Sequence, residues 1–312
     1  MRSVRAAAAV GRVIVVDNTS DDGSVSAAHA AGADVVVENG SNLGFARAVN
    51  TGLKGSTADL VLLLNPDAEL GPKSLASMCG TLHREPGAVI VAPLLRGAGG
   101  AVTAGAGRFA TLPRRVGLCV PVVGRARYFS PQYHLCPAAL SAGAALEVDY
   151  VYGAAMLIDG AFLRQASGLD ERFFLFAEDE DICRQARAAG RRVLLDTRAV
   201  AAHVGGASCG DEALTEAQRL YSTYLLFDKW RGSRAAAAYH AGIVSASWLR
   251  VGEARAGRRP DSAVDIARMS AAFDDAVRRG VQPLLATRPA AAPPAADSVG
   301  AGTTADDHGA CR

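Results

Sequence analysis

Two short apolar runs that end in acidic turns decide the fold of this chain. They are Val13-Ile-Val-Val-Asp-Asn18 and Leu60-Val-Leu-Leu-Leu-Asn-Pro-Asp67. Each is rich in β-branched residues or Leu and stops at turn-forming residues, which is typical of a buried strand. Further strands are predicted at 35–37, 88–92, 148–158, 193–195 and 200–203, and helices at 27–31, 45–54, 73–84, 162–166 and 179–189. Strands that alternate with helices at these spacings predict an α/β fold, with a mostly parallel sheet flanked by helices.

The composition suits a globular protein and excludes several functional classes. Of 312 residues, 50% are hydrophobic and 21% are charged, and the net charge is only +2. A charge so close to zero gives no bulk attraction for nucleic acid. The six cysteines include no CxxC pair, so neither a disulfide framework nor a zinc ribbon is indicated, and a reducing cytoplasm is the simplest location. The sequence contains no apolar run as long as a membrane span and no signal peptide.

Polar residues follow three of the predicted strands. Asp17 and Asn18 follow the first, Asn42 and Gly44 come after the second, and Asn65-Pro66-Asp67 ends the third. Each group alone has a structural explanation as a turn or a helix entry. Together at one sheet edge they favour a nucleotide-type site, because ligands of open parallel sheets bind beyond the carboxyl ends of the strands.

A second concentration of polar residues is the acidic run Glu178-Asp-Glu-Asp181, which follows an aromatic stretch. Acids in the first turn of a helix complement its dipole, but one or two would suffice. Carboxylates in this setting can also bind a cation or serve as a general base. His203, directly before Val-Gly-Gly, is a candidate metal ligand at the end of another strand.

On these residues the chain resembles glycosyltransferase family 2 proteins of the GT-A fold, in their rhamnosyltransferase-like branch. The resemblance implies a Rossmann-like sheet and covers roughly residues 10 to 210. The matching segments, in the order of the family, are Val13–Gly23, Asn42–Gly52, Leu62–Ala68, Val151–Ile158, Gly168–Phe174, Glu178–Asp181 and His203–Ser208. Any one of these segments is a weak signal, whereas the ordered set is highly specific.

The resemblance assigns roles to individual residues. The nucleotide-sugar site would contain Asp17, Asn18, Asn42, Gly44, Phe45, Asn50 and Asn65. Asp67 would be the metal-binding aspartate of the DXD motif, which here reads Asn65-Pro66-Asp67, and His203 would complete the metal site with Mg²⁺ or Mn²⁺. Asp179 would be the catalytic base, beside Glu178, and Asp181 would orient the acceptor or the helix.

The resemblance also implies partners and domains. The donor would be a nucleoside-diphosphate sugar, first of all dTDP-L-rhamnose, with a hexosyl or galactofuranosyl donor as the alternative. The acceptor would be a glycan or a lipid-linked sugar, with peripheral contact to the inner face of the plasma membrane. Residues 1–95 would form the nucleotide-sugar-binding half of one domain and 96–210 its acceptor-binding and catalytic half. Residues 211–285 would be a helical extension and 286–312 a disordered tail. In the second half, Arg108, Arg114, Arg115, Arg125 and Arg127 are available for phosphates, although solvated surface arginines are the simpler interpretation of each.

The sequence departs from the family at its start. The family has one more strand before Val13, in the middle of the sheet, and here the chain begins inside the helix that follows it. We therefore expect a gap in the sheet, and a true start about 30 residues upstream. A truncated, non-catalytic sugar-nucleotide-binding protein is the alternative function. A nicotinamide-dependent dehydrogenase is excluded because no GxGxxG follows the first strand.

Overall fold

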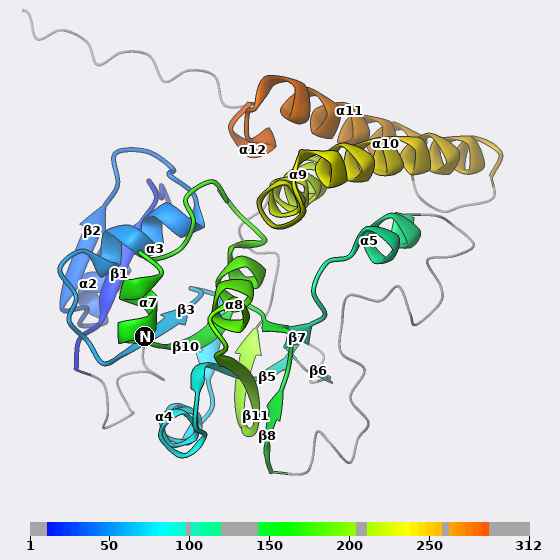
Figure 1. Cartoon of the computed structure of the whole chain (residues 1–312). Coiled ribbons are helices and arrows are strands. Elements are labelled where there is room, and N and C mark those ends of the chain that lie inside the picture. The colour runs from blue at the N-terminus through cyan, green and yellow to red at the C-terminus, as the bar shows by residue number, and fades with distance from the viewer. Residues whose placement is uncertain are drawn as a thin grey trace, which may run out of the picture.

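The structure is a computed structural model that describes residues 11–97, 101–103, 105–119, 143–203, 211–257 and 262–286. The predicted tail, Arg125, Arg127 and the stretch after His203 lie outside the described residues. The elements of the first half are β1 (Ile14–Asp17), α2 (Ser24–Ala30), β2 (Val35–Glu38), α3 (Phe45–Leu53), β3 (Leu60–Leu64), β4 (Ala68–Leu70), α4 (Ser74–Arg84) and β5 (Ala88–Arg96). Strands and helices alternate as the sequence predicts, and the α/β class with helices on the sheet is confirmed (Figure 1).

The second half completes the sheet and adds the acidic helix. Its elements are β6 (Val102–Thr103), β7 (Ala106–Gly107), α5 (Leu112–Cys119), β8 (Ala145–Glu147), β9 (Tyr150–Val151), β10 (Ala155–Asp159), α7 (Gly160–Gln165), α8 (Glu178–Ala188) and β11 (Arg192–His203). β11 is one strand where the sequence predicts two, and the register shift between Asp196 and Val200 explains the break in the apolar pattern.

The main sheet is mixed, which corrects the prediction of a mostly parallel one. Its order is β3-β10-β5-β11-β4, and only β5 and β11 pair in parallel within it. β10 lies antiparallel between β3 and β5, and β4 is antiparallel to β11. The alternation of strands and helices does not reveal this, because strand direction is set by which distant strand each one pairs with.

β1 and β2 form a separate two-stranded parallel sheet. Among the described strands, β1 pairs only with β2, and β3 pairs only with β10. The described part of the chain thus has the gap in the sheet that the sequence leads us to expect.

A layer of helices follows the sheet domain. It consists of α9 (Glu212–Arg231), α10 (Ser233–Arg255), α11 (Ala263–Arg279) and the short α12 (Pro283–Ala286). Figure 1 shows α9, α10 and α11 stacked together, with α9 above the acidic helix α8. An apolar face of α9 packs into this layer, with Leu220 and Phe227 buried and Tyr224 and Trp230 partly buried. No helix among the described residues is long and apolar enough to cross a membrane.

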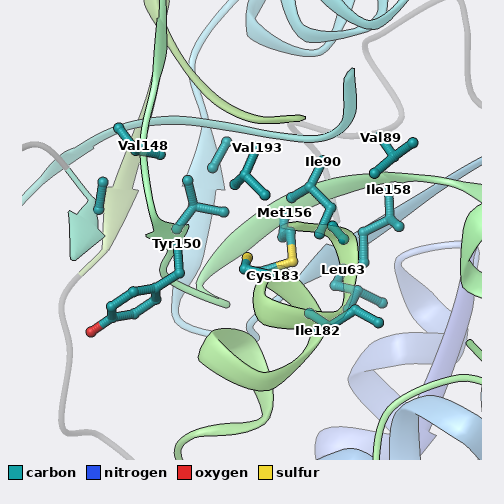
Figure 2. Close-up of a cluster of buried hydrophobic side chains, with 14 of the residues drawn as sticks. Leu63, Val89, Ile90, Val148, Tyr150, Met156, Ile158, Ile182, Cys183 and Val193 are labelled. Carbon is teal, nitrogen blue, oxygen red and sulfur yellow. The ribbon is translucent and has the colours of Figure 1, made fainter. Parts of the chain in front are cut away.

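One part of the core of the sheet domain lies between the sheet and α8, and another lies between the sheet and α4. Figure 2 shows a cluster of the first part, in which Ile90 and Val193 of the sheet face Ile182 and Cys183 of α8. These four side chains are fully buried. Their apolar contacts hold the helix that carries the acidic run against the sheet.

Candidate active site

The first part of the candidate site lies at the end of β1. The carboxylate of Asp17 is buried and accepts the backbone N–H of Ser20 (2.9 Å), and hydrogen bonds from Ser20 lower its pKa. Asn18 joins two loops: its side chain donates to the carbonyl of Gly44 (3.1 Å) and accepts from the amide of Asn39 (2.8 Å). The polar residues that follow β1 and β2 therefore meet, as the sequence predicts.

The segment after β2 is fixed against the loop that precedes α8. Asn42 accepts the backbone N–H of Gly44 (3.0 Å), and the backbone N–H of Phe45 donates to the carbonyl of Phe174 (2.7 Å). Gly44 has φ +84°, and a Cβ added there would lie 2.4 Å from the carbonyl oxygen of Phe174. Only glycine fits at this approach.

Asn50 has a structural role in this region. Its side chain bonds both the N–H (2.9 Å) and the carbonyl (2.8 Å) of Leu169, and it also donates to Glu171 (3.1 Å). Asn50 lines a cleft of about 320 Å³ between α3, β3 and α7, together with Lys54, Val61 and other residues. No other residue predicted for the nucleotide, metal or catalytic site lines that cleft.

The end of β3 brings Asp67 and His203 together. β4 pairs with the last residues of β11, with Ala68 opposite His203, and this register places the imidazole Nε2 3.3 Å from Oδ1 of Asp67. The backbone N–H of Asn65 donates to the carbonyl of Ala154 (3.0 Å). The side-chain Oδ1 of Asn65 is buried and has no hydrogen-bond partner among the described residues, which makes it an acceptor available to a donor group of a ligand.

The Asp67–His203 pair fits a divalent cation. A carboxylate oxygen and an imidazole nitrogen are ligands that Mn²⁺ accepts, whereas Mg²⁺ prefers oxygen ligands throughout. Among the described residues, no group of three or more His, Cys, Asp or Glu side chains is arranged so that it could hold a metal ion. A cation held by this pair would therefore need further ligands, and diphosphate oxygens are of the required kind.

Glu178 and Asp179, the first two acids of α8, have no cationic partner among the described contacts. Asp179 accepts the backbone N–H of Gly153 (3.2 Å), next to Ala154 and hence beside the end of β3. Burial raises the pKa of Asp179 to about 6. Burial, and then the charge of Asp179, raise the pKa of Glu178 to about 8. The Oε2 atom of Glu178 is buried and unpartnered within the described part of the chain.

The last two acids of the run, Glu180 and Asp181, have hydrogen-bond and ion-pair partners within the protein. Asp181 is fully buried and is held by α9: Lys229 Nζ (2.8 Å) and the indole N–H of Trp230 (2.7 Å) both donate to it. This position fits the predicted role of Asp181 in orienting the helix. Glu180 accepts from Arg184 (2.7 Å) and Arg115 (3.1 Å). The prediction that Arg115 is available for phosphates is wrong, because its guanidinium is buried against Glu180.

Hydrogen bonds and short connecting stretches of chain thus link many of the predicted site residues. The links run from Asn18 through Gly44 and the Phe174 loop to Glu178 and Asp179. They continue through Gly153 to the end of β3, where Asp67 and His203 lie. Sequence reasoning gave no role to Asn39 and only a place in a motif to Gly153. Asn39 opens the same polar loop as Asn42, and Gly153 interrupts the apolar run of the predicted strand 148–158, so a signal was present for both.

Comparisons with known proteins agree with the resemblance seen in the motifs. Residues 2–126 match the description "Glycosyl transferase family 2". A low-salt glycan biosynthesis hexosyltransferase, Agl10 of Haloferax volcanii, is 27% identical over 57% of this chain and 54% of its own length. An N-acetylglucosaminyl-diphospho-decaprenol L-rhamnosyltransferase of Mycobacterium tuberculosis is 29% identical over 70% of this chain and 76% of its own length. The chain thus spans about half the length of the first relative and about three quarters of the second.

Solved structures show looser likeness. GalNAc-T7, solved with UDP, GalNAc and Mn²⁺, is 12% identical with a TM-score of 0.47, over 63% of this chain and 38% of its own. The mannosyltransferase PcManGT of Pyrobaculum calidifontis, solved with GDP-Man and Mn²⁺, is 18% identical with a TM-score of 0.45, over 88% of this chain and 69% of its own.

Proposed function

We propose, from the match of residues 2–126 to glycosyltransferase family 2, that the chain is an inverting, metal-dependent glycosyltransferase. It moves a sugar from a nucleoside-diphosphate donor to a hydroxyl of a glycan or lipid-linked acceptor. The observation that carries the proposal is that a candidate cation site and a candidate catalytic base lie beside the same strand end. Asp67 and His203 lie 3.3 Å apart at the end of β3. Asp179, with a raised pKa, is bonded to Gly153 beside that same strand end.

The donor contacts follow from the strand ends. Asp17, Asn18 and the Asn42–Phe45 segment hold the nucleoside, and Asn65 offers its unpartnered oxygen to the donor. Asp67 and His203 hold the cation, which would offset the negative charge that develops on the leaving diphosphate. L-Rhamnose is the first donor sugar to test, because one relative is named as a rhamnosyltransferase. That relative's name also makes a diphospho-prenol-linked sugar the first acceptor, which would bring the enzyme to the inner face of the plasma membrane.

The reaction is a single displacement. The acceptor oxygen forms a bond to the anomeric carbon while the bond from that carbon to the diphosphate oxygen breaks, and the electron pair leaves with the diphosphate. Asp179 takes the proton of the acceptor hydroxyl. A carboxylate with a pKa of about 6 is ionised near neutral pH and is still basic enough to accept that proton. Attack on the face opposite the leaving group inverts the anomeric centre.

The test is sugar transfer with a defined donor panel. The chain is incubated with Mn²⁺, with dTDP-L-rhamnose and UDP- and GDP-hexoses in separate reactions, and with N-acetylglucosaminyl-diphospho-prenol as acceptor. We expect release of nucleoside diphosphate with one donor, formation of a glycosylated product of inverted configuration by NMR, and loss of both in Asp179→Asn. A product of retained configuration contradicts the role of Asp179. Tight donor binding by calorimetry without turnover in any reaction would instead support the alternative, a sugar-nucleotide-binding protein.

A further inference from the structure

The turn that leads into the two unpaired acids has an unfavourable backbone conformation. Phe176 and Ala177, directly before Glu178, both have φ +69°. This left-handed region favours glycine, and two consecutive residues with side chains there are under strain. Ala177 begins α8 without any side-chain cap. Such a turn persists only where its surroundings hold it in place.

The surroundings that hold the turn come from α9. The hydroxyl of Ser222 donates to the carbonyl of Leu175 (2.7 Å), one residue before the strained pair. The guanidinium of Arg219 lies over the ring of Phe176, 4.1 Å from its centre. Both contacts reach the turn from the helical layer, one on its backbone and one on its side chain.

The same helix also holds the chain after the acids. Lys229 and Trp230 both donate to Asp181, as described above, and Lys229 also pairs with Asp170 (2.8 Å) at the start of the loop. Residues 219, 222, 229 and 230 recur at intervals that place them on one face of a helix. α9 therefore contacts the chain on both sides of Glu178 and Asp179.

We propose that α9 is the element that positions the Glu178–Asp179 carboxylates, with Ser222 and Arg219 acting as positioning residues that hold the strained Phe176–Ala177 turn. The proposal rests on the proposed function, because it names what fixes the base of that reaction. It gives the helical layer a role in catalysis although none of its described residues belongs to the predicted nucleotide, metal or catalytic set.

The test compares two buried serines that each donate a hydrogen bond to a carbonyl. Ser222 bonds the loop, whereas Ser247 bonds Ile243 within its own helix α10 (2.9 Å). Ser222→Ala should lower kcat roughly tenfold to a hundredfold with little change in the donor KM, since a small displacement of a catalytic group has effects of this size. Ser247→Ala should leave kcat within about twofold of the original value. Arg219→Ala should act like Ser222→Ala, and Arg219→Lys should restore part of the activity.

Two further measurements separate positioning from general stability. The acid limb of kcat against pH should move to lower pH in Ser222→Ala, because a loosened Asp179 regains contact with water. Ala177→Gly, added to Ser222→Ala, should recover kcat, since glycine adopts this φ without strain. The same Ala177→Gly change, added to Ser247→Ala, should bring no gain in kcat. If the two serine variants lose kcat equally, or if the acid limb stays in place, the proposal is overturned.

A measurement that does not depend on enzymatic activity tests the positioning role of α9 separately from the proposed function. Hydrogen exchange of the amides in residues 172–183 should quicken in Ser222→Ala and stay unchanged in Ser247→Ala. Unchanged exchange in Ser222→Ala overturns the role of α9, whatever the enzyme transfers. Faster exchange in a chain that transfers no sugar would leave the positioning intact and contradict only the proposed function.

Discussion

The imidazole Nε2 of His203 lies 3.3 Å from Oδ1 of Asp67, although one residue follows β3 and the other ends β11. The local sequence around Asp67 or around His203 does not by itself place the two side chains next to each other. Their proximity is produced by the short strand β4, whose antiparallel register with β11 sets Ala68 opposite His203. The pairing of two strands thus turns two separate polar residues into one possible cation site.

The first prediction concerns this pair. Asp67→Asn and His203→Ala should each lower kcat by about 10²–10³-fold at fixed Mn²⁺, the loss seen when one group that stabilises developing charge is removed. Part of the loss should return at high Mn²⁺, and chelation with EDTA should abolish activity in the unmodified protein. Initial rates across a Mn²⁺ titration measure both effects.

Glu69 supplies the matched control for the metal variants. It is an exposed carboxylate on β4, two residues after Asp67, which directly precedes that strand. Glu69→Gln should leave the Mn²⁺ dependence unchanged. Equal losses in Glu69→Gln and Asp67→Asn would show that the effect is one of local charge, and would contradict a cation held by Asp67.

The second prediction concerns pH. Asp179 must be ionised to accept a proton, and its pKa is raised to about 6, so kcat should fall below about pH 6 and level off above it. The fall should be about tenfold per pH unit when a single group titrates. Asp179→Asn should lower kcat by roughly 10²–10⁴-fold and remove this limb. A limb that persists in Asp179→Asn with its midpoint unchanged would assign the base to another group.

The third prediction concerns stability. Burial raises the pKa of Glu178 from its ordinary 4.5 to about 8. Between these values the unfolded chain releases the proton and the folded chain keeps it, so this carboxyl makes the fold less stable as pH rises from about 4.5 to about 8. Glu178→Gln removes that dependence. The Tm of the variant should therefore fall less between pH 5 and pH 8 than the Tm of the unmodified protein. The difference between the two falls should be a few °C, since about 1 kcal/mol shifts Tm by roughly 2–4 °C at this size.

Calorimetry at several pH values checks this third prediction, with exposed Glu38 as the reference carboxyl. Glu38→Gln should follow the unmodified protein at every pH. A parallel pH dependence of Tm in Glu178→Gln and the unmodified protein would mean that Glu178 is ionised in the fold.

The sequence predicts local features of the fold well. The ends of β1, β3 and β11 are visible because turn-forming residues stop each apolar run, and most helices of the sheet domain are found within a few residues. What it misses is long-range pairing. β10 inserts antiparallel between β3 and β5, which no local pattern encodes. α11 lies within the predicted helical extension of residues 211–285, although its own bounds were not predicted.

In the candidate site, too, local features can be predicted from the sequence, whereas long-range contacts cannot. The acidic run is conspicuous in sequence, but the pattern cannot separate its four acids. Arg184 and Gln185, each one helical turn from its acid, are the local partners of Glu180 and Asp181. Arg115 and Lys229 reach Glu180 and Asp181 from distant elements, whereas Glu178 and Asp179 have no such partner among the described contacts and are the pair that we propose to be reactive. The distinction between structural and reactive acids therefore depends on tertiary packing.

The last prediction concerns Gly44. A Cβ at this position would lie 2.4 Å from the carbonyl oxygen of Phe174 and 2.6 Å from a ring carbon of the same residue, at φ +84°. Gly44→Ala should therefore separate the Asn42–Phe45 segment from the loop before α8. Since the proposed nucleoside contacts lie on that segment, the donor KM should rise at least about tenfold. The strained residue should in addition lower the stability of the fold by ~1–3 kcal/mol.

Gly40 in the same polar loop is the control for this variant, because a Cβ there would meet nothing within 4 Å. Gly40→Ala should change the donor KM by less than about twofold. Kinetics at saturating acceptor, together with donor affinity from calorimetry, distinguish lost binding from lost folding. If Gly44→Ala is folded and binds the donor with unchanged affinity, the nucleoside does not contact this segment. The donor would then have to be placed elsewhere along the strand ends.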